Sequence, residues 1–265
     1  MFYREFEPTG AARSFIKCFW VLDDPTPSSE PQRIFPDGRS ELIFNLAEPF
    51  ESDSTKGWQR QPKSFVVGQI TGPMLIRSRG PAKILGVRFH PHGANRMLRT
   101  PASELTDSVV ALGDISSHLD AVADRLHDCH SVELQLRVIE DVAEDLSAKN
   151  ARTHDAAILF AASEFERTHG LASISDVARQ LGISVRQLER RFLSAVGVAP
   201  KLFCRLMRFQ RVVRAMDGPA NNWTDTAINA GYYDQAHLIR DFRQFTGKAP
   251  TALLDAELNL NSLFA

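Results

Sequence analysis

Arginine and glutamine side chains occur in two short stretches near the C-terminal end of the chain, and Arg190 and Arg240 hold matching places in them. Arg186 and Arg190 lie in the first stretch, and Gln235 and Arg240 lie in the second. An arginine guanidinium can donate two hydrogen bonds to O6 and N7 of guanine, and a glutamine amide can pair with N6 and N7 of adenine. These residue types therefore indicate recognition of base edges, provided that the chain holds them on an exposed face.

Helical spacing places these side chains on an outward face. A helix turns by about 100° per residue, so Arg186 and Arg190 lie opposite Leu188. In the second stretch, Arg240 holds the same place relative to Leu238. The two leucines are expected to be buried, and the arginines therefore face away from the core.

A basic segment surrounds the first stretch. Residues 179–214 contain nine lysine or arginine residues and one acidic residue, Glu189, although the whole chain of 265 residues has a net charge of −1. A solvated helix usually mixes charges of both signs, whereas a local excess of positive charge favours a polyanionic partner. Glu189 lies on the flank of the exposed face, where we favour pairing with a neighbouring arginine over acceptance from cytosine N4.

The two stretches belong to an internal repeat. Gly182 and Gly231 are related by an offset of 49 residues, whereas Phe192 and Phe242 are related by an offset of 50. One residue has therefore been inserted in the turn after the glycine. Insertions belong in turns, so this slip indicates a repeated structural unit.

Local signals predict a helix, a glycine-containing turn and a second helix in each copy. Ser173 and Asn222 are N-cap residue types that open the first helices, and Ser184 with Gln187 forms a capping pair at the start of a second helix. Glycines at the helix ends can adopt the left-handed conformation. Two helices joined in this way form a helix-turn-helix, whose second helix enters the DNA major groove. The residues expected to contact DNA are Ser184, Arg186, Gln187, Arg190, Arg191, Asp234, Gln235, Ala236, His237 and Arg240.

One helix is expected between the copies, over residues 201–216. At 1.5 Å per residue it spans about 24 Å. Two recognition helices on one face of a duplex lie about 34 Å apart, which is one DNA turn. If this helix is too short for straight DNA, the duplex must bend, which costs about 1–6 kcal/mol.

Residues 174–200 and 227–250 resemble the AraC/XylS family of bacterial transcription regulators. The resemblance covers about 100 of the 265 residues, and the second motif is the more specific. It implies a protein that binds DNA through two helix-turn-helix units on one chain. Many members of this family carry a separate domain for effector sensing or dimerisation.

Short apolar runs bounded by turn residues predict a β-rich domain over residues 1–115. The strands expected are 39–46, 64–68 and 84–89, and the loops expected are 26–31 and 51–63. Several short strands separated by turns fit a sandwich or a barrel-like domain. This region is similar to a less characterised domain that precedes the helix-turn-helix module in some family members, which implies a sensor role without naming a ligand.

A helical segment follows the β-rich region. Leu134, Val138, Val142 and Leu146 recur every four residues after Ser131, a candidate N-cap, and predict a helix over 131–147 with this stripe in the core. Residues 147–154 are expected to be a polar linker. The chain is therefore expected to be an α+β protein with a β-rich domain (1–115), a helical connector (116–150) and an all-α DNA-binding domain (151–265).

Composition indicates a globular protein, with 43% hydrophobic and 24% charged residues. No run of about 18 apolar residues predicts a membrane span, and the first residues lack the pattern of a signal peptide. Cys18, Cys129 and Cys204 lie far apart in the sequence and favour a reducing, cytoplasmic location without a disulfide framework.

Two histidines, His90 and His92, invite a metal site. Two ligands do not close a zinc site, and the chain has no CxxC or HExxH motif, so neither metal nor cofactor is expected. Together with Cys18, these histidines are the weak basis for an alternative in which the N-terminal domain is an enzyme; no catalytic triad or activated nucleophile can be assigned. A DNA-bending protein without sequence preference is a further alternative.

Aromatic residues of the β-rich region are the candidates for lining an effector pocket. They are Trp20, Phe44, Trp58 and Phe65, and packing in the core is the competing explanation for each of them. We therefore predict a sequence-specific transcription regulator, not an enzyme. The partners considered are double-stranded DNA, a small-molecule effector, RNA polymerase and a second copy of the chain.

Overall fold

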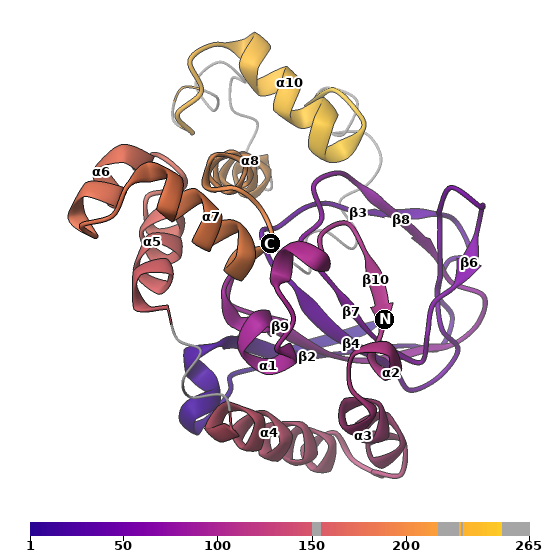
Figure 1. The fold of residues 1–265 in the computed structure, drawn as a ribbon. Coiled ribbons are helices and arrows are strands. Elements are labelled where there is room, and N and C mark those ends of the chain that lie inside the picture. Colours follow the sequence, from indigo (N-terminus) through magenta and orange to yellow (C-terminus); the bar gives the residue numbers. More distant parts are fainter. Residues whose placement is uncertain (150–154, 217–227, 229, 251–265) are drawn as a thin grey trace.

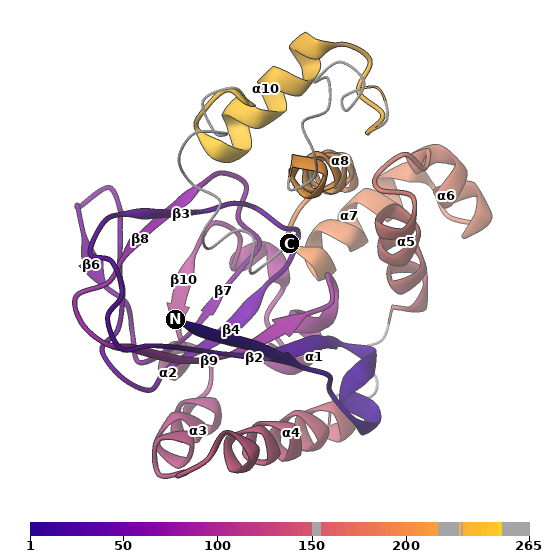
Figure 2. The ribbon, with the colours of Figure 1, turned by 180° about the vertical axis from the view of Figure 1, so that it is seen from behind.

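The computed structural model describes residues 1–149, 155–216, 228 and 230–250. Strands and short helices build a β-rich half up to residue 149, and helices alone build a second half from residue 155 onward (Figure 1). The helical half lies against one end of the β-rich half, and helices α3 (Ser117–His127) and α4 (Val132–Lys149) lie along its lower side in both views (Figures 1 and 2). The predicted α+β class is confirmed.

A six-stranded antiparallel sheet forms the centre of the β-rich half. Its strands, in spatial order, are β1 (Phe2–Phe6), β2 (Ile16–Asp24), β9 (Ala82–Phe89), β4 (Glu41–Asn45), β7 (Ser64–Val67) and β10 (Val109–Ala111). Side chains alternate along a strand, so β2 sends Phe19 and Val21 to one face and Trp20 and Leu22 to the other. Both faces are apolar, and each therefore needs a covering layer.

A four-stranded sheet covers the face that carries Trp20 and Leu22. Its strands, in spatial order, are β3 (Gln32–Ile34), β8 (Met74–Arg77), β5 (Glu51–Ser52) and β6 (Gln59–Arg60). No strand of one sheet pairs with a strand of the other among the described residues, so the arrangement is a sandwich rather than a closed barrel. Residues 51–63, expected to be a loop, contribute β5 and β6; two-residue strands are too short to show the alternation from which strands are predicted.

Helices cover the other face of the six-stranded sheet. Leu119 and Val122 of α3 and Ile139 of α4 belong to the same buried cluster as Phe19 of β2. Helices α3 and α4, which lie in the segment 116–150 that was expected to be a connector, therefore pack as a third layer on the sheet. An amphipathic helix has the same pattern whether it covers a sheet or bridges two domains, so the sequence could not separate the two arrangements. The boundaries at 115 and 150 stay a prediction.

Helix α4 begins after Ser131, whose Oγ accepts a hydrogen bond from the Leu134 amide at 3.3 Å, so the predicted cap is confirmed. The predicted stripe is wrong at its first position, because Leu134 is 47% exposed. The buried face instead carries Gln135, Ile139 and Val142. A row at every fourth residue rotates by about 40° per step and leaves the buried face, whereas alternating steps of three and four remain on it.

The helical half contains the predicted repeat. Its described helices are α5 (Ala156–Arg167), α6 (Ile174–Gln180), α7 (Val185–Val196), α8 (Pro200–Met216) and α10 (Gln235–Thr246). The helix expected to open the second copy near Asn222, together with Trp223, lies outside the described residues. The four repeat glycines adopt positive φ angles of 65° (Gly182), 97° (Gly197), 85° (Gly231) and 74° (Gly247). They end the helices and turns as predicted, because glycine adopts this conformation without a Cβ clash.

All three cysteines are free thiols. Burial raises the pKa of Cys18 and of Cys204 to about 11, so both thiols stay protonated at neutral pH. A search of the described helices finds none with the length and apolar character needed to cross a membrane.

Candidate functional site

Each recognition helix, α7 in the first copy and α10 in the second, begins at a side-chain cap. The backbone N–H of Gln187 donates to Ser184 Oγ at 3.2 Å, and the backbone N–H of Ser184 donates to Gln187 Oε1 at 2.9 Å. In the second copy, Asp234 Oδ1 accepts from the His237 amide at 2.7 Å. The predicted capping pair is confirmed. DNA contact by Ser184, Gln187 and Asp234 stays a prediction, and their polar groups already hold the helix starts in place.

Helix α8 holds the two copies in a fixed relation. Phe203 packs against Phe192 of α7 with ring centroids 5.5 Å apart, and Phe209 packs against Phe242 of α10 with centroids 5.0 Å apart. Phe192 and Phe242 are equivalent in the repeat, so each recognition helix turns the same side toward α8. Aromatic pairs of this kind add about 0.5–1.5 kcal/mol to the free energy of packing. The rigid α8, about 26 Å long, therefore sets the spacing of the recognition helices.

The predicted arginines lie on the outward faces. Arg186, Arg190 and Arg240 are exposed, whereas Leu188 and Leu238 on the opposite sides of the helices are buried. Within the part of the chain that the structure describes, none of the three guanidinium groups makes a hydrogen bond or ion pair. Both faces can therefore be approached by a polyanion.

The remaining predicted contacts lie around the start of α10. Gln235 and Ala236 are exposed, and Ala236 lies in the same outward direction as Arg240. The ring of His237 is half-buried and packs edge-on against Tyr232 with centroids 5.1 Å apart. The ring of His237 thus contributes to packing, whereas the side chains of Gln235 and Ala236 are accessible to a ligand.

Two exposed residues of the second copy were missed by the sequence reasoning. Arg243 is exposed and lies about 60° from Arg240 around the helix, on the outward side of α10. The same helical wheel that selected Arg240 could have found it. Tyr233, the residue inserted into the turn of the second copy, is 93% exposed. The insertion itself was the signal, because an extra residue at a helix start reaches toward whatever that helix binds.

Two ion pairs connect the recognition helices to earlier helices. One joins α7 to the N-terminal end of α5, and the other joins α10 to α8. Arg191 Nε donates to Asp155 Oδ2 at 2.6 Å, and Arg205 Nη2 donates to Asp241 Oδ1 at 2.6 Å. Arg191 and Asp241 are equivalent by the offset of 50 residues and carry opposite charges. Asp155 lies before the turn glycine, where the offset is 49, so Arg205 is one residue away from its equivalent position. Arg191, expected to contact DNA, therefore forms an ion pair inside the helical half, as does Arg205.

A cleft of about 370 Å³ opens between α7 and helix α1 (Gly93–Leu98) of the β-rich half. Arg190 and Arg191 line one side, and His92 and Arg96 line the other. Arg96 Nη1 donates to Ser14 Oγ at 2.6 Å, which holds the guanidinium on the β-rich side. The cleft adds positive charge beside the outward face of α7.

A second candidate site is a cavity of about 120 Å³ between the two sheets. Trp20, Ile43 and Phe65 line it from the six-stranded sheet, and Ile34 and Ile76 line it from the four-stranded sheet. An apolar cavity of about 150 Å³ can hold a benzene-sized molecule. The cavity between the sheets can therefore receive a compact, mainly apolar ligand.

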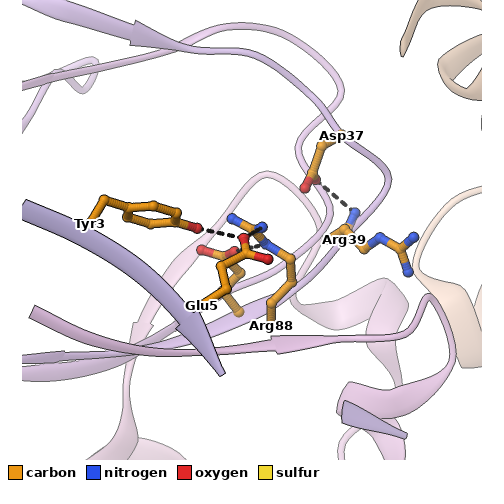
Figure 3. Close-up of polar contacts among 6 residues, drawn as sticks. Tyr3, Glu5, Asp37, Arg39 and Arg88 are labelled. Carbon is orange, nitrogen blue, oxygen red and sulfur yellow. Dashed lines mark hydrogen bonds and ion pairs between the residues drawn. The ribbon is translucent and has the colours of Figure 1, made fainter. Parts of the chain in front are cut away.

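Charged residues close one end of this cavity. Arg88, only 2% exposed, donates from Nε to Glu41 at 2.6 Å and from Nη1 to Glu5 at 2.9 Å. Tyr3 donates its hydroxyl hydrogen to the same Glu5 oxygen at 2.6 Å (Figure 3). Burial holds the pKa of Glu41 above its ordinary value against the opposing charge of Arg88. The sequence reasoning missed this cluster, although an arginine within an apolar strand requires a buried carboxylate partner.

The four aromatic residues predicted to line an effector pocket divide into two groups. Trp20 and Phe65 line the cavity. Phe44 is fully buried on the helix-covered face of the sheet, because its neighbour Ile43 faces the cavity and side chains alternate along β4. Trp58 lies outside the cavity, with the Arg77 guanidinium 4.3 Å above its ring. Phe44 and Trp58 therefore do not line this cavity, and effector binding by any of the four residues stays a prediction.

The two histidines that invited a metal reading stack on each other. The rings of His90 and His92 are nearly parallel, with centroids 6.1 Å apart. Over the described ranges, no group of three or more histidine, cysteine or carboxylate side chains is placed to hold a metal ion. The pair thus offers at most two ligands.

Replacing His90 with asparagine is expected to reduce the loss of stability at mildly acidic pH. Burial, and then the charges of Arg39 and Lys17, lower the pKa of His90 to about 4, whereas its pKa in an unfolded chain is about 6.5. Below pH about 6.5 the unfolded chain takes up a proton that the folded chain refuses until about pH 4, so folding loses stability across this window. Urea unfolding should show the wild type losing about 1 kcal/mol more than the variant between pH 7.5 and 5.5. Equal losses would contradict a histidine held neutral in the fold.

Replacing Gly86 with alanine is expected to lower the free energy of unfolding by about 1–3 kcal/mol. A Cβ at this position of β9 would lie 2.0 Å from Trp20 Cε2, so the indole ring would have to shift within the sandwich. Gly80→Ala is the matched control, because its Cβ would meet only the Glu48 side chain, at 3.5 Å. Urea titration of both variants checks the expectation, and equal stabilities would show that Trp20 is not held against Gly86.

Two known families match separate parts of the chain. Residues 4–111 match a family described as a domain of unknown function (DUF6597), and residues 177–256 match a family described as a helix-turn-helix domain. The first match covers most of the sandwich, and the second covers both recognition helices.

Individual relatives were found by sequence and by structure. The chain is 29% identical over 124 residues to the regulatory protein HrpB of Ralstonia nicotianae, which is 46% of this chain and 25% of HrpB. The aligned part therefore spans about a quarter of the length of that relative. Among solved structures, ToxT of Vibrio cholerae in complex with a methylnaphthalenyl butenoic acid gives a TM-score of 0.49 at 12% identity, over 89% of this chain and 98% of ToxT. Another ToxT structure gives a TM-score of 0.46 at 12% identity, over 89% of this chain and 97% of that one.

Proposed function

Because this chain carries a helix-turn-helix domain of the AraC type at its C-terminal end, we propose that it is a sequence-specific, DNA-binding transcription regulator. The two recognition helices enter successive major-groove segments of one duplex. Arg186 and Arg190 act from α7, and Gln235, Arg240 and Arg243 act from α10. The β-rich half senses a small molecule and adjusts how the helical half binds DNA.

One observation carries the proposal. Both recognition helices turn their buried leucine and phenylalanine toward a shared core around α8, and both turn exposed arginines away from it. Arg190 and Arg240 are both exposed, and Arg190 also borders the cleft between α7 and the β-rich half. Arginine side chains that are free to move on a helix surface suit hydrogen bonding to guanine and to phosphate.

The cavity between the sheets supports the sensing role. Its walls are mainly apolar, and its polar lining residues are Asp37, Arg39, Glu41, Gln61 and Arg88. Ligand sites typically combine apolar walls with a few polar groups that fix orientation. The effector class that fits is a molecule of about single-ring size with one polar group directed at these polar residues.

The proposal assigns no catalytic role to His90, His92 or Cys18. The buried Cys18 thiol is held protonated by its raised pKa and is a poor nucleophile. The regulator acts in the cytoplasm with double-stranded DNA as its partner, and RNA polymerase and a second copy of the chain are the further partners proposed.

Selection of bound fragments from random DNA, followed by anisotropy titration at a stated salt concentration, tests the proposal. The full chain should bind the selected duplex about 10³-fold or more tightly than a random duplex at 150 mM salt. Repeating the selection with a metabolite extract tests whether an effector changes affinity or sequence preference.

Two results would overturn the proposal in different ways. Equal affinity for the selected and the random duplex would assign the chain to architectural proteins that bend DNA without sequence preference. No binding to either duplex, by a chain shown to be folded, would remove DNA as the partner.

A further inference from the structure

One segment of the chain belongs to both candidate sites at once. Residues 35–39 connect β3 to β4, and three of them, Phe35, Asp37 and Arg39, line the cavity between the sheets. The same segment lies against α8 and α5 of the helical half. Three contacts join it to the helical half: a ring contact, a backbone hydrogen bond and an ion pair.

The first contact is apolar. Phe35 is only 5% exposed and lines the cavity, yet it belongs to the buried cluster of the helical half and not to that of the sandwich. Its ring meets Phe209 of α8 edge-on, with centroids 6.5 Å apart. Phe209 in turn packs on Phe242 of recognition helix α10 at 5.0 Å. A displacement of Phe35 by a ligand would therefore press on the ring that positions the second recognition helix.

The second contact is made by the backbone of the segment. The Pro36 carbonyl accepts a hydrogen bond from Gln210 Nε2 of α8 at 2.6 Å, and the bond is buried. Gly38, with φ of 79°, passes so close to α8 that a Cβ would lie 2.5 Å from Met207 Cε. Its carbonyl accepts from Gln69 Nε2 at 2.7 Å, which ties the segment to the loop that borders the cavity on its other side. A side chain at Gly38 would both strain the backbone and push α8 away.

The third contact is an ion pair. Arg39 Nη2 donates to Glu166 Oε1 of α5 at 2.5 Å, and the Arg39 side chain is 12% exposed. Figure 3 shows the guanidinium of Arg39 pointing away from Arg88, while the Asp37 carboxylate accepts from the Arg39 amide at 2.9 Å. Arg39 Nη1 is buried and makes no hydrogen bond within the described ranges, so it can still donate to an acceptor on a ligand.

From these contacts we propose that residues 35–39 transmit occupancy of the cavity to the helical half. A molecule in the cavity touches Phe35 and Arg39 directly, and these residues hold α8 and α5 by the contacts just described. Occupancy and DNA binding are therefore linked thermodynamically, and each changes the equilibrium constant of the other by the same factor. This inference rests on the proposed function for its DNA readout, but its first step, from cavity to α8, does not.

A substitution that fills the cavity tests the link without knowledge of the ligand. Ile76→Trp places a large ring into the cavity from β8, and Leu75→Trp is the matched control, because its side chain alternates to the opposite face of the same strand. Both changes are made in the full chain and in a chain that carries Glu166→Gln and Gln210→Leu. These two substitutions weaken the link from the helical side, because they remove the hydrogen bond to Pro36 and the ion pair to Arg39, and they leave the walls of the cavity and the contact of Phe35 with Phe209 intact.

Two readouts are measured for each chain. The first is amide hydrogen exchange of residues 203–210 in α8, which needs no DNA; the second is affinity for the selected duplex. Ile76→Trp should change both in the chain with the intact link, with an affinity change of about 5- to 150-fold. In the chain with the weakened link the change in exchange and the change in affinity should both be clearly smaller, and Leu75→Trp should have little effect in either chain.

The outcomes separate the inference from the proposed function. An exchange change in α8 that is equally large with the link weakened would overturn transmission through residues 35–39. Unaltered exchange and unaltered affinity in Ile76→Trp, with the wild type still binding its duplex, would overturn it as well. A link-dependent exchange change in a chain that binds no duplex would support transmission while removing the DNA-binding function. Thermal unfolding of each variant confirms that the chain is folded, and Glu166→Gln alone replaces the double change if the latter does not fold.

Discussion

Replacing Arg205 with leucine is expected to lower the free energy of unfolding of the helical half by about 3 kcal/mol, because the change leaves a buried carboxylate without its partner. Asp241 is only 1% exposed, and it accepts hydrogen bonds from Arg205 Nε at 3.0 Å and from Nη2 at 2.6 Å. The same guanidinium also donates to Gln244 at 2.6 Å. Loss of these bonds detaches α10 from α8, so affinity for the selected duplex should fall with the stability. Urea unfolding followed by circular dichroism measures the first effect.

A double variant distinguishes the unpaired charge from a general packing defect. If Arg205→Leu acts by stranding Asp241, then adding Asp241→Leu should recover much of the lost stability, since replacing both partners of a buried pair by apolar groups is often neutral or stabilising. A double variant as unstable as the sum of the two single variants would show that the pair does not hold α10. The charge-exchanged pair of the first copy, Asp155 with Arg191, allows the same cycle to be run on α7.

Replacing Arg190 with alanine is expected to weaken binding to the selected duplex by about 5- to 150-fold, which corresponds to about 1–3 kcal/mol for a base-contacting arginine. The side chain is exposed on α7, opposite the buried Leu188, so its removal should leave the stability of the fold unchanged within about 0.5 kcal/mol. The loss should be concentrated on the selected sequence, because a base contact contributes little to binding of random DNA. Anisotropy titrations on both duplexes measure this difference.

Arg214→Ala is the matched control for charge. Arg214 is exposed in the last turn of α8 and lies outside both recognition helices. Removal of its charge should weaken binding to the selected and to the random duplex alike. The number of counterions released on binding, obtained from the salt dependence of the affinity, should fall by about one. If Arg190→Ala behaves in the same way as Arg214→Ala, then Arg190 contacts phosphate and does not read a base.

The repeat could be predicted from the sequence because its signals are local. The left-handed glycines, such as Gly197 and Gly247, and the Ser184–Gln187 cap depend on residues within one turn of each other. The outward arginines follow from the period of the helix. Each of these features needs only a few neighbouring residues, so one sequence contains all the information that they require.

The features that were missed depend on contacts between distant parts of the chain. The Pro36 carbonyl and Gln210 are 174 residues apart, and Arg39 and Glu166 are 127 residues apart. No local pattern marks a loop residue such as Phe35 as part of the core of another domain. The layer formed by α3 and α4 was hidden for the same reason.

Some missed features could have been found from the sequence. The 50-residue offset relates Arg191 to Asp241, and this exchange of charge sign between equivalent positions marks Arg191 as a residue with a role in the fold. The buried cluster around Arg88 was marked by an arginine within the apolar strand β9.

Methylation interference at guanine N7 tests most directly whether two recognition helices occupy the major groove of one duplex. With the selected duplex and the wild-type chain, the account predicts two groups of interfering guanines whose centres lie about 10 base pairs apart. Arg190→Ala should abolish interference in one group only, and Arg240→Ala should abolish it in the other. A single group of guanines, or a pattern that neither substitution alters, would contradict the account.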